Sequence, residues 1–335
     1  MSAERYGSQY GPDLTFLGIP ACTWSDPATY AEAAVVILGA PFDGGTSYRS
    51  GARLGPGAVR GADYLGHDGN RPHLALRVAA LTELGVRDAG DVLMFSGDAA
   101  GSVAALAEAV TTIARQGVIP LVLGGDHTIT WPDATGVARA VGWGRVSVVH
   151  FDAHADTGMT EFGSLIGHGQ PMRRLIESGA VRGDRFIQIG LRGYWPGPSD
   201  LAWMRAQGMR SYEMSEIGAR GLMAVLDEAF ERATDDCDAV FLSVDVDVVD
   251  PGSAPGTGTP EPGGLSSRQL LDAVRRVALE LPLAGADVVE LSPPYDHADI
   301  TAMLANRVVL EILSGIAGRR RGLTWQPERP LLDGR

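Results

Sequence analysis

Five ionisable residues of this sequence stand at a spacing of two, in two groups that each directly follow a short apolar run. One group is Asp152, His154 and Asp156, and the other is Asp245 and Asp247. Residues two apart in an extended chain point to the same side. Each group therefore presents its side chains together, in a way that suits the binding of a divalent metal ion.

Two more apolar runs are followed by residues of the same kind. Residues 124–127 read Gly-Gly-Asp-His after the run 119–123, and Glu290 follows Val289. In an open α/β sheet, ligands bind beyond the carboxyl ends of the strands. If the four runs are parallel strands, His127 and Glu290 should therefore lie beside the two groups above.

The combined set carries a large negative charge, and no Lys or Arg belongs to it. A buried carboxylate must be paired, hydrogen-bonded or metal-bound, and divalent cations are the natural compensation. The set has too many ligands for one ion and suits two, with two carboxylates bridging. Carboxylates with some imidazole favour Mn²⁺, with Ni²⁺, Co²⁺, Fe²⁺ and Zn²⁺ as alternatives. The absence of Cys ligands argues against a structural zinc site.

Each segment taken alone has a structural alternative. Gly-Gly-Asp-His at 124–127 is most often a turn, and Asp-x-Asp before Pro251 can be turn chemistry. His150, inside an apolar run, is expected to be a core histidine with satisfied hydrogen bonds or a residue directly behind the site. The position of all these segments at the same end of apolar runs favours the metal site.

The elements that position these residues alternate along the chain. Near-continuous apolar runs are typical of strands buried on both faces, and they alternate with Ala-rich segments of helical spacing. This order predicts a single α/β domain in three layers, a mostly parallel sheet with helices on both faces. We expect strands at 35–38, 119–123, 146–151, 186–189, 240–244 and 288–291, and helices at 99–115, 218–233 and 267–280.

Charge and composition limit the partners. The chain has 335 residues and a formal net charge of −13, which argues against nucleic acid and anionic membrane and suits a small cationic substrate. The two cysteines, Cys22 and Cys237, are too few for a disulfide framework.

No signal peptide and no apolar stretch of about 20 residues is recognised, so we expect a cytoplasmic protein. We expect an N-terminal arm at 1–32, one domain at 33–320 and a C-terminal tail at 321–335.

Three segments resemble the signature motifs of the ureohydrolase family, which comprises arginase, agmatinase, guanidinobutyrase and formiminoglutamase. They are residues 124–127, residues 151–157 (Phe-Asp-Ala-His-Ala-Asp-Thr) and residues 243–251 (Ser-Val-Asp-Val-Asp-Val-Val-Asp-Pro). The resemblance extends from about residue 35 to the last helix. It implies an eight-stranded parallel sheet, assembly as a homo-oligomer (a trimer or hexamer), and two Mn²⁺ per subunit.

The resemblance also implies how the ligands are shared. One ion would be held by His127, Asp152, Asp156 and Asp245. The other would be held by Asp152, His154, Asp245 and Asp247, so that Asp152 and Asp245 would bridge.

It further implies the reaction, which is hydrolysis of a guanidinium group to release urea. Asp156 would pass a proton to the leaving amine. Glu290 would pair with the planar guanidinium as a two-pronged fork. His168 would shuttle protons between solvent and the site; a loop histidine with a structural hydrogen bond is the alternative.

The tail of the substrate is predicted from the loop after the second motif. Arginases have an Asn where this sequence has Gly158, so the arginine anchor is missing. Glu161 could meet the terminal amine of agmatine, and Phe162 could line its methylene chain; a solvated Glu161 is an equal expectation. We therefore expect agmatine to be cleaved to putrescine and urea.

Gln170, where agmatinases usually have Thr, keeps other substrates open. The alternatives are 4-guanidinobutyrate, 3-guanidinopropionate, free guanidine or a larger guanidino metabolite. Arginine, a formimino compound and a catalytically inert binding homologue rank below these.

Overall fold

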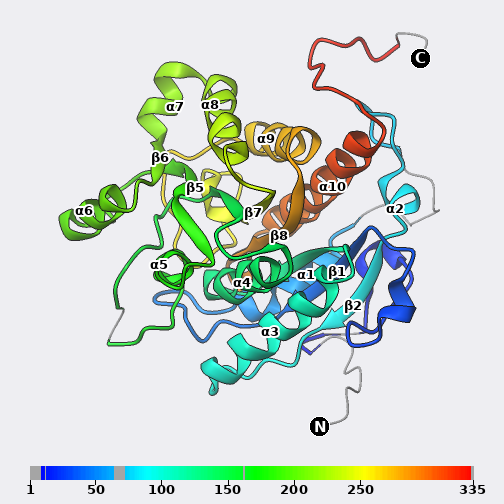
Figure 1. The fold of residues 1–335 in the computed structure, drawn as a ribbon, viewed down its shortest axis with the longest axis horizontal. Helices are drawn as coiled ribbons and strands as arrows, with labels where there is room; N and C mark the ends of the chain where they lie inside the picture. Colours follow the sequence, from blue (N-terminus) through cyan, green and yellow to red (C-terminus); the bar gives the residue numbers. More distant parts are fainter. Residues whose placement is uncertain (1–8, 12, 64–71, 161–162, 333–335) are drawn as a thin grey trace.

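Eight parallel strands form one sheet with the order β2-β1-β3-β8-β7-β4-β5-β6 (Figure 1). The structure is a computed structural model that describes residues 9–11, 13–63, 72–160 and 163–332. Every neighbouring pair is parallel, so the predicted α/β sheet is confirmed. The strands are β1 (Val35–Ala40), β2 (Arg87–Asp91), β3 (Ile119–Gly124), β4 (Val146–Phe151), β5 (Val181–Leu191), β6 (Arg210–Glu213), β7 (Ala239–Asp245) and β8 (Leu283–Val289).

The apolar runs of the sequence lie in the inner strands, although β8 begins at Leu283, before the expected start at 288, and ends at Val289, before Glu290. β2 and β6 were not predicted, and they are the two outer strands of the sheet. Both are short and contain charged residues. An edge strand is paired on one side only, so it does not need the continuous apolar run that marks a central strand.

Helices cover both faces of the sheet, as alternate side chains of each strand require (Figure 1). Val149 and Ile187 pack in the cluster that includes residues of α8, α9 and α10. Their neighbours Val148 and Phe186 pack in the cluster that includes residues of α3, α4 and α5. The helices are α1 (Gly55–Gly61), α2 (Ala80–Glu83), α3 (Ala99–Ala114), α4 (Thr130–Val141), α5 (Pro171–Glu177), α6 (Pro198–Ala206), α7 (Met214–Arg220), α8 (Leu222–Thr234), α9 (Ser267–Glu280) and α10 (Ile300–Arg320).

The helix expected at 218–233 is two helices. Gly221 has φ +82°, which separates α7 from α8. Glycine takes this left-handed conformation without the steric cost that a Cβ would bring. The break was not predicted because the apolar spacing alone continues through it.

α10 corrects the expectation that the chain has no apolar stretch long enough to span a membrane. By length and composition this 21-residue helix is apolar enough, and 72% of its apolar window is buried inside the protein. It packs along α9 in the core. Burial of this kind is the ordinary state of a core helix in a large α/β domain.

The first segment of the chain lies on the body of the domain. Phe16 and Ile19 belong to the core, and the Phe16 amide donates to Asp88 Oδ2 at 2.7 Å. The buried guanidinium of Arg60 binds the same carboxylate and that of Asp91. Residues 1–8 and 12 of the expected arm lie outside the described residues.

Candidate metal centre and substrate pocket

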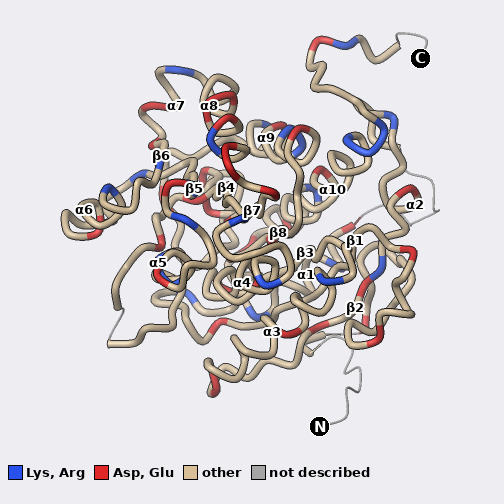
Figure 2. Tube along the Cα trace, in the orientation of Figure 1, with Lys and Arg blue, Asp and Glu red and all other residues tan. Residues whose placement is uncertain are grey.

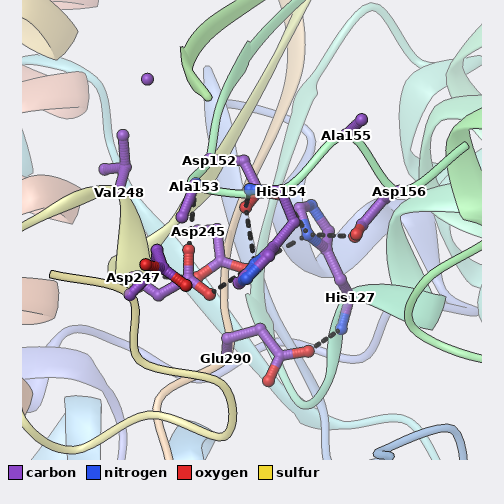
Figure 3. A network of polar contacts seen from close by, with 12 residues as sticks. His127, Asp152, Ala153, His154, Ala155, Asp156, Asp245, Asp247, Val248 and Glu290 are labelled. Atoms are coloured by element: carbon purple, nitrogen blue, oxygen red, sulfur yellow. Dashed lines mark hydrogen bonds and ion pairs between the residues drawn. The ribbon is translucent and has the colours of Figure 1, made fainter. Parts of the chain in front are cut away.

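The four central strands β3, β8, β7 and β4 are neighbours, and each is followed by an ionisable residue identified in the sequence. Parallel strands place these ends at one edge, and the side chains converge there (Figure 3). In Figure 2 acidic residues are spread over the trace and also occur near β4 and β7, at the centre of the molecule. The convergence expected from the sequence is therefore present.

Three carboxylates surround one nitrogen of His127. Its Nδ1 lies 3.1 Å from Asp152 Oδ2, 3.0 Å from Asp156 Oδ2 and 3.2 Å from Asp245 Oδ2. All four side chains are buried. This is the first of the two ligand groups that the resemblance implies.

The second group lies around His154. Its Nδ1 is 3.1 Å from Asp247 Oδ2 and 3.5 Å from Asp152 Oδ1. Asp152 thus turns one oxygen to each group, which is the arrangement a bridging ligand needs. Asp245 turns Oδ2 to the first group, while its Oδ1 accepts the Asp247 amide at 2.7 Å.

The ligands converge through bends and not through the extended chain that their spacing suggested. β4 ends at Phe151, and Asp156 has φ +52°. Asp247 lies in the 3-10 turn η5 (Val246–Val248) after β7. A left-handed φ on a residue other than glycine costs about 1 kcal/mol or more and is common at functional sites.

The pKa values of His127, His154 and Asp245 are raised, as expected where carboxylates gather around histidines without a cation. Burial opposes a charge on His127 and His154, but contacts with Asp152, Asp156 and Asp245 hold the pKa of His127 well above its usual value, and Asp247 and Asp152 do the same for the pKa of His154. Burial, and then the charge of Asp247, raises the pKa of Asp245. Divalent ions would displace the protons that these groups otherwise share.

The donor set fits divalent metal ions. His127 Nδ1 and Asp247 Oδ2 are buried and make no hydrogen bond within the described part of the chain. The nitrogen lies close to a carboxylate oxygen of Asp152, and the oxygen lies close to Nδ1 of His154. Such atoms are costly to bury unless something else binds them. The residues present are carboxylates and imidazoles, which suit Mn²⁺ and its neighbours.

Glu290 lies beside the ligands with one oxygen held and one free. Its Oε1 accepts the His127 amide at 2.8 Å and lies 3.0 Å from His168 Nδ1. Its Oε2 is buried and has no hydrogen-bond partner among the described residues. The residue has φ +64°. The two-pronged contact with a guanidinium stays a prediction, and Oε2 is the oxygen that is left for it.

His168 connects Glu290 with the protein surface. In the neutral form of the ring, its Nε2 can accept the Ser47 amide at 3.1 Å; it also lies 2.6 Å from Ser47 Oγ, and Ser47 is exposed. Burial opposes a charge on the ring, but Glu290 raises the pKa of His168 to about 10. Bound divalent cations would repel a proton on this ring and lower that value again.

Asp126, which had no predicted role, holds the loop that carries Ser47. Its Oδ2 accepts the Gly45 amide at 2.8 Å, and its own amide donates to Phe42 O at 2.7 Å. Burial and the nearby charge of Glu290 raise the pKa of Asp126 to about 6. The Gly-Gly-Asp-His segment therefore supplies both a candidate ligand and an anchor for the pocket wall.

A pocket of about 290 Å³ opens above these groups. Its polar and aromatic lining beyond the ligands and Glu290 is Ser47, Thr160, His168, Gln170, Trp195 and Thr259. A larger cavity of about 1010 Å³ lies elsewhere, among α9, α10 and residues 322–331, and it contains none of the predicted ligands. Trp195 was not predicted from the sequence, because loop residues reach a pocket without any periodic pattern. Thr160 lies in the loop after the second motif, where contacts with the substrate tail were expected.

Space at Gly158 excludes an arginase-type side chain. The Gly158 amide donates to Gly169 O at 2.9 Å, and a Cβ at position 158 would lie 2.9 Å from that same oxygen. An Asn there would have to move the backbone. Glu161 and Phe162, the predicted contacts of the substrate tail, lie outside the described residues.

Known proteins match this chain over most of its length. Residues 33–315 match the family described as the arginase family. Guanidinopropionase of Pseudomonas aeruginosa is 40% identical over 305 residues, which are 90% of this chain and 91% of that protein. Mitochondrial agmatinase of Gallus gallus is 37% identical over 284 residues, 84% of this chain and 81% of that protein.

A solved structure agrees with these matches. Proclavaminate amidinohydrolase from Streptomyces clavuligerus has a TM-score of 0.82 and 36% identity, covering 92% of this chain and 99% of that one. The resemblance predicted from the three motifs is confirmed. The chain belongs to the arginase family, as an amidinohydrolase that acts on guanidino compounds.

Proposed function

We propose that the protein hydrolyses a guanidino compound to an amine and urea at a binuclear centre of two Mn²⁺ per subunit. One observation carries the proposal. Asp152 turns one oxygen to each of the two ligand groups, and Glu290 Oε2 has no hydrogen-bond partner among the described residues beside them. The residues that would hold the ions are His127, Asp152, His154, Asp156, Asp245 and Asp247.

Each side chain around the centre can take a different part in the hydrolysis of the guanidinium group. Two bound cations would supply a water that is deprotonated at neutral pH. Glu290 Oε2 can accept an N–H of the guanidinium and so turn its carbon toward the ligands. Asp156 can carry a proton to the leaving amine, and His168 can pass protons to Ser47 and the solvent.

Agmatine is the substrate that we propose. The described lining of the pocket has carboxylates, hydroxyls, two imidazoles, an amide and an indole, and no Arg or Lys belongs to it. A carboxylate tail would find no Arg or Lys side chain in this lining, whereas an ammonium tail can rest on an indole ring and on oxygen acceptors. The proposed Glu161 contact would add a charge partner.

A guanidino acid such as 3-guanidinopropionate is the second candidate. Ser47, Thr160 and Thr259 are hydroxyl donors in the pocket lining, and hydroxyls can bind a carboxylate. Guanidinopropionase is among the similar proteins.

Assembly and location are further proposals. We propose a cytoplasmic homo-oligomer, a trimer or hexamer. Membership of the arginase family supports the assembly, as the resemblance of the motifs implied. Light scattering on the purified protein tests it, and a monomer would contradict it.

Urea release tests the function. The protein is loaded with Mn²⁺ or Ni²⁺ and given agmatine, 4-guanidinobutyrate, 3-guanidinopropionate, arginine or guanidine, with metal content measured in parallel. We expect the highest kcat/KM for agmatine with Mn²⁺. Preference for a guanidino acid would replace agmatine by the second candidate. A folded protein that takes up no metal would overturn the binuclear centre.

A further inference from the structure

A row of polar side chains crosses the sheet two residues before the ligands. Register pairs place its members side by side on five consecutive strands. We call it the polar row, and it consists of Asp287 (β8), Ser243 (β7), His150 (β4), Gln188 (β5) and Ser211 (β6). The first four are completely buried and Ser211 is partly buried. Such a row inside an apolar core requires that each hydrogen bond be satisfied.

The orientation of the Gln188 amide is determined by its neighbours. Its Nε2 donates to the carbonyl oxygen of Ala155 at 2.7 Å. Since a carbonyl oxygen can only accept, the atom facing it must be the NH₂ group. The other amide atom, Oε1, accepts the hydroxyl of Ser211 at 2.8 Å. The contact with the Ala155 carbonyl selects this orientation, and the Ser211 hydroxyl, which can donate or accept, is compatible with it.

This orientation in turn determines the tautomer of His150. The second Nε2 proton of Gln188 points at His150 Nδ1, 3.2 Å away. That nitrogen must therefore be the acceptor, and Nε2 of the neutral ring carries the proton. His150 Nε2 lies 2.9 Å from Asp152 Oδ2 and donates to it.

We propose that Gln188 and His150 are positioning residues that hold Asp152 in the orientation in which it bridges the two ligand groups. His150, His127 and Asp152 are close enough to form a ligand trio, but a protonated Nε2 has no lone pair for a metal, so His150 is a hydrogen-bond donor. This inference rests on the proposed binuclear centre.

One amide thus fixes two parts of the site. Through His150 it fixes Asp152, whose other oxygen accepts the His154 amide at 2.6 Å. Through the carbonyl of Ala155 it fixes the bend between His154 and Asp156, which is visible beside Asp152 in Figure 3. Loss of this amide should therefore disturb both ligand groups.

Ser243, another member of the polar row, contacts His127, the histidine of the first ligand group. His127 Nε2 lies 3.0 Å from Ser243 Oγ, and the neighbouring Asp287 accepts Thr130 Oγ1 at 2.7 Å. The ring therefore turns Nδ1 to the carboxylates. Partners of this kind behind metal ligands typically change metal affinity by 10- to 100-fold when mutated.

The tautomer can be measured directly. We would record ¹⁵N spectra of histidine-labelled wild-type protein loaded with diamagnetic Zn²⁺, and assign His150 by comparison with His150→Asn. We expect a protonated Nε2 and an unprotonated Nδ1. A proton on Nδ1, or metal-bound Nε2, would overturn the proposal. This measurement needs no Gln188 variant to fold.

A variant that introduces a charge at position 188 tests whether Gln188 positions the metal ligands. Gln188→Glu replaces the NH₂ group by an oxygen that cannot donate to His150 or Ala155. We expect Mn²⁺ affinity, measured by titration with detection of free Mn²⁺, to fall by roughly 10- to 100-fold, with the His150 proton moved to Nδ1. Gln207→Glu, the same change after α6, should keep wild-type affinity and spectrum.

The outcomes separate this inference from the proposed function. Wild type that binds two Mn²⁺ and releases urea, with unchanged affinity in folded Gln188→Glu, would refute the positioning inference alone. Wild type that binds no metal would refute the proposed centre, while the His150 tautomer in the metal-free protein would still decide the hydrogen-bond assignment.

Discussion

Replacement of Glu290 by Gln tests the guanidinium contact most directly. Glu290 Oε1 is already used by the His127 amide and by His168, and Oε2 is unbound. A Gln side chain can keep the first oxygen in place, but its NH₂ group would then occupy the position of Oε2. Two donors would face each other when a guanidinium enters, and the negative charge would be gone.

The magnitude follows from the contact that is lost. A hydrogen bond to a charged group contributes about 1.5–3 kcal/mol, which corresponds to roughly a 10- to 150-fold loss of kcat/KM. A contact made already with the bound substrate should appear mainly as an increase of KM. The fold should persist, because Gln has the same length and the same backbone requirement at φ +64°.

The assay is urea release over a range of agmatine concentrations, with metal content determined for each sample. Glu290→Asp is the matched control, since it keeps the charge and withdraws it by one methylene. If Glu290→Gln holds two metal ions and its kcat/KM stays within about twofold of wild type, a difference below about 0.5 kcal/mol, the assignment of Oε2 to the guanidinium is wrong.

Four further outcomes are expected. Asp152→Asn removes the charge shared by both ligand groups, so urea release should be lost while circular dichroism stays unchanged; full activity would contradict a binuclear centre. Contacts with carboxylates raise the pKa of His127 and His154, which favours the charged form of both rings without metal. Calorimetry in buffers of different ionisation enthalpy should therefore detect proton release on Mn²⁺ binding, and affinity should increase with pH. Two ions at about 100 times their Kd would stabilise the fold by about 5 kcal/mol, so a chelator should lower the Tm by roughly 7 °C. Gly158→Asn should destabilise the fold by about 1–3 kcal/mol without conferring arginine hydrolysis, as the contact with Gly169 O requires.

The inner strands of the sheet and the convergence of the candidate ligands could be predicted from the sequence, because both follow from local features. Asp152 and Asp245 stand at the ends of buried strands, and a group of carboxylates without basic partners is costly to bury unless cations bind it. The bends at Asp156 and Asp247 were not predicted, since a spacing of two is also what an extended chain would give.

Other features depend on contacts that no local pattern encodes. Trp195 reaches the pocket from a loop, and β6 is a short polar edge strand. Gln188 and Ser211 meet only through the register of β5 and β6, which sequence order does not reveal. His150 was expected either in the core or behind the site, and the choice required knowledge of its partners.

The proposed metal centre forms only if the central parallel strands pair in the correct register. A strand advances about 3.3 Å per residue and alternates its faces, so a slip of one residue in β4 would turn Asp152 to the opposite side of the sheet. The metal ions would then lose a shared ligand, and the polar row would lose its partners at the same time. Uptake of two ions can thus serve as an assay for correct folding, because mispaired forms of the sheet would keep their secondary structure and fail to load.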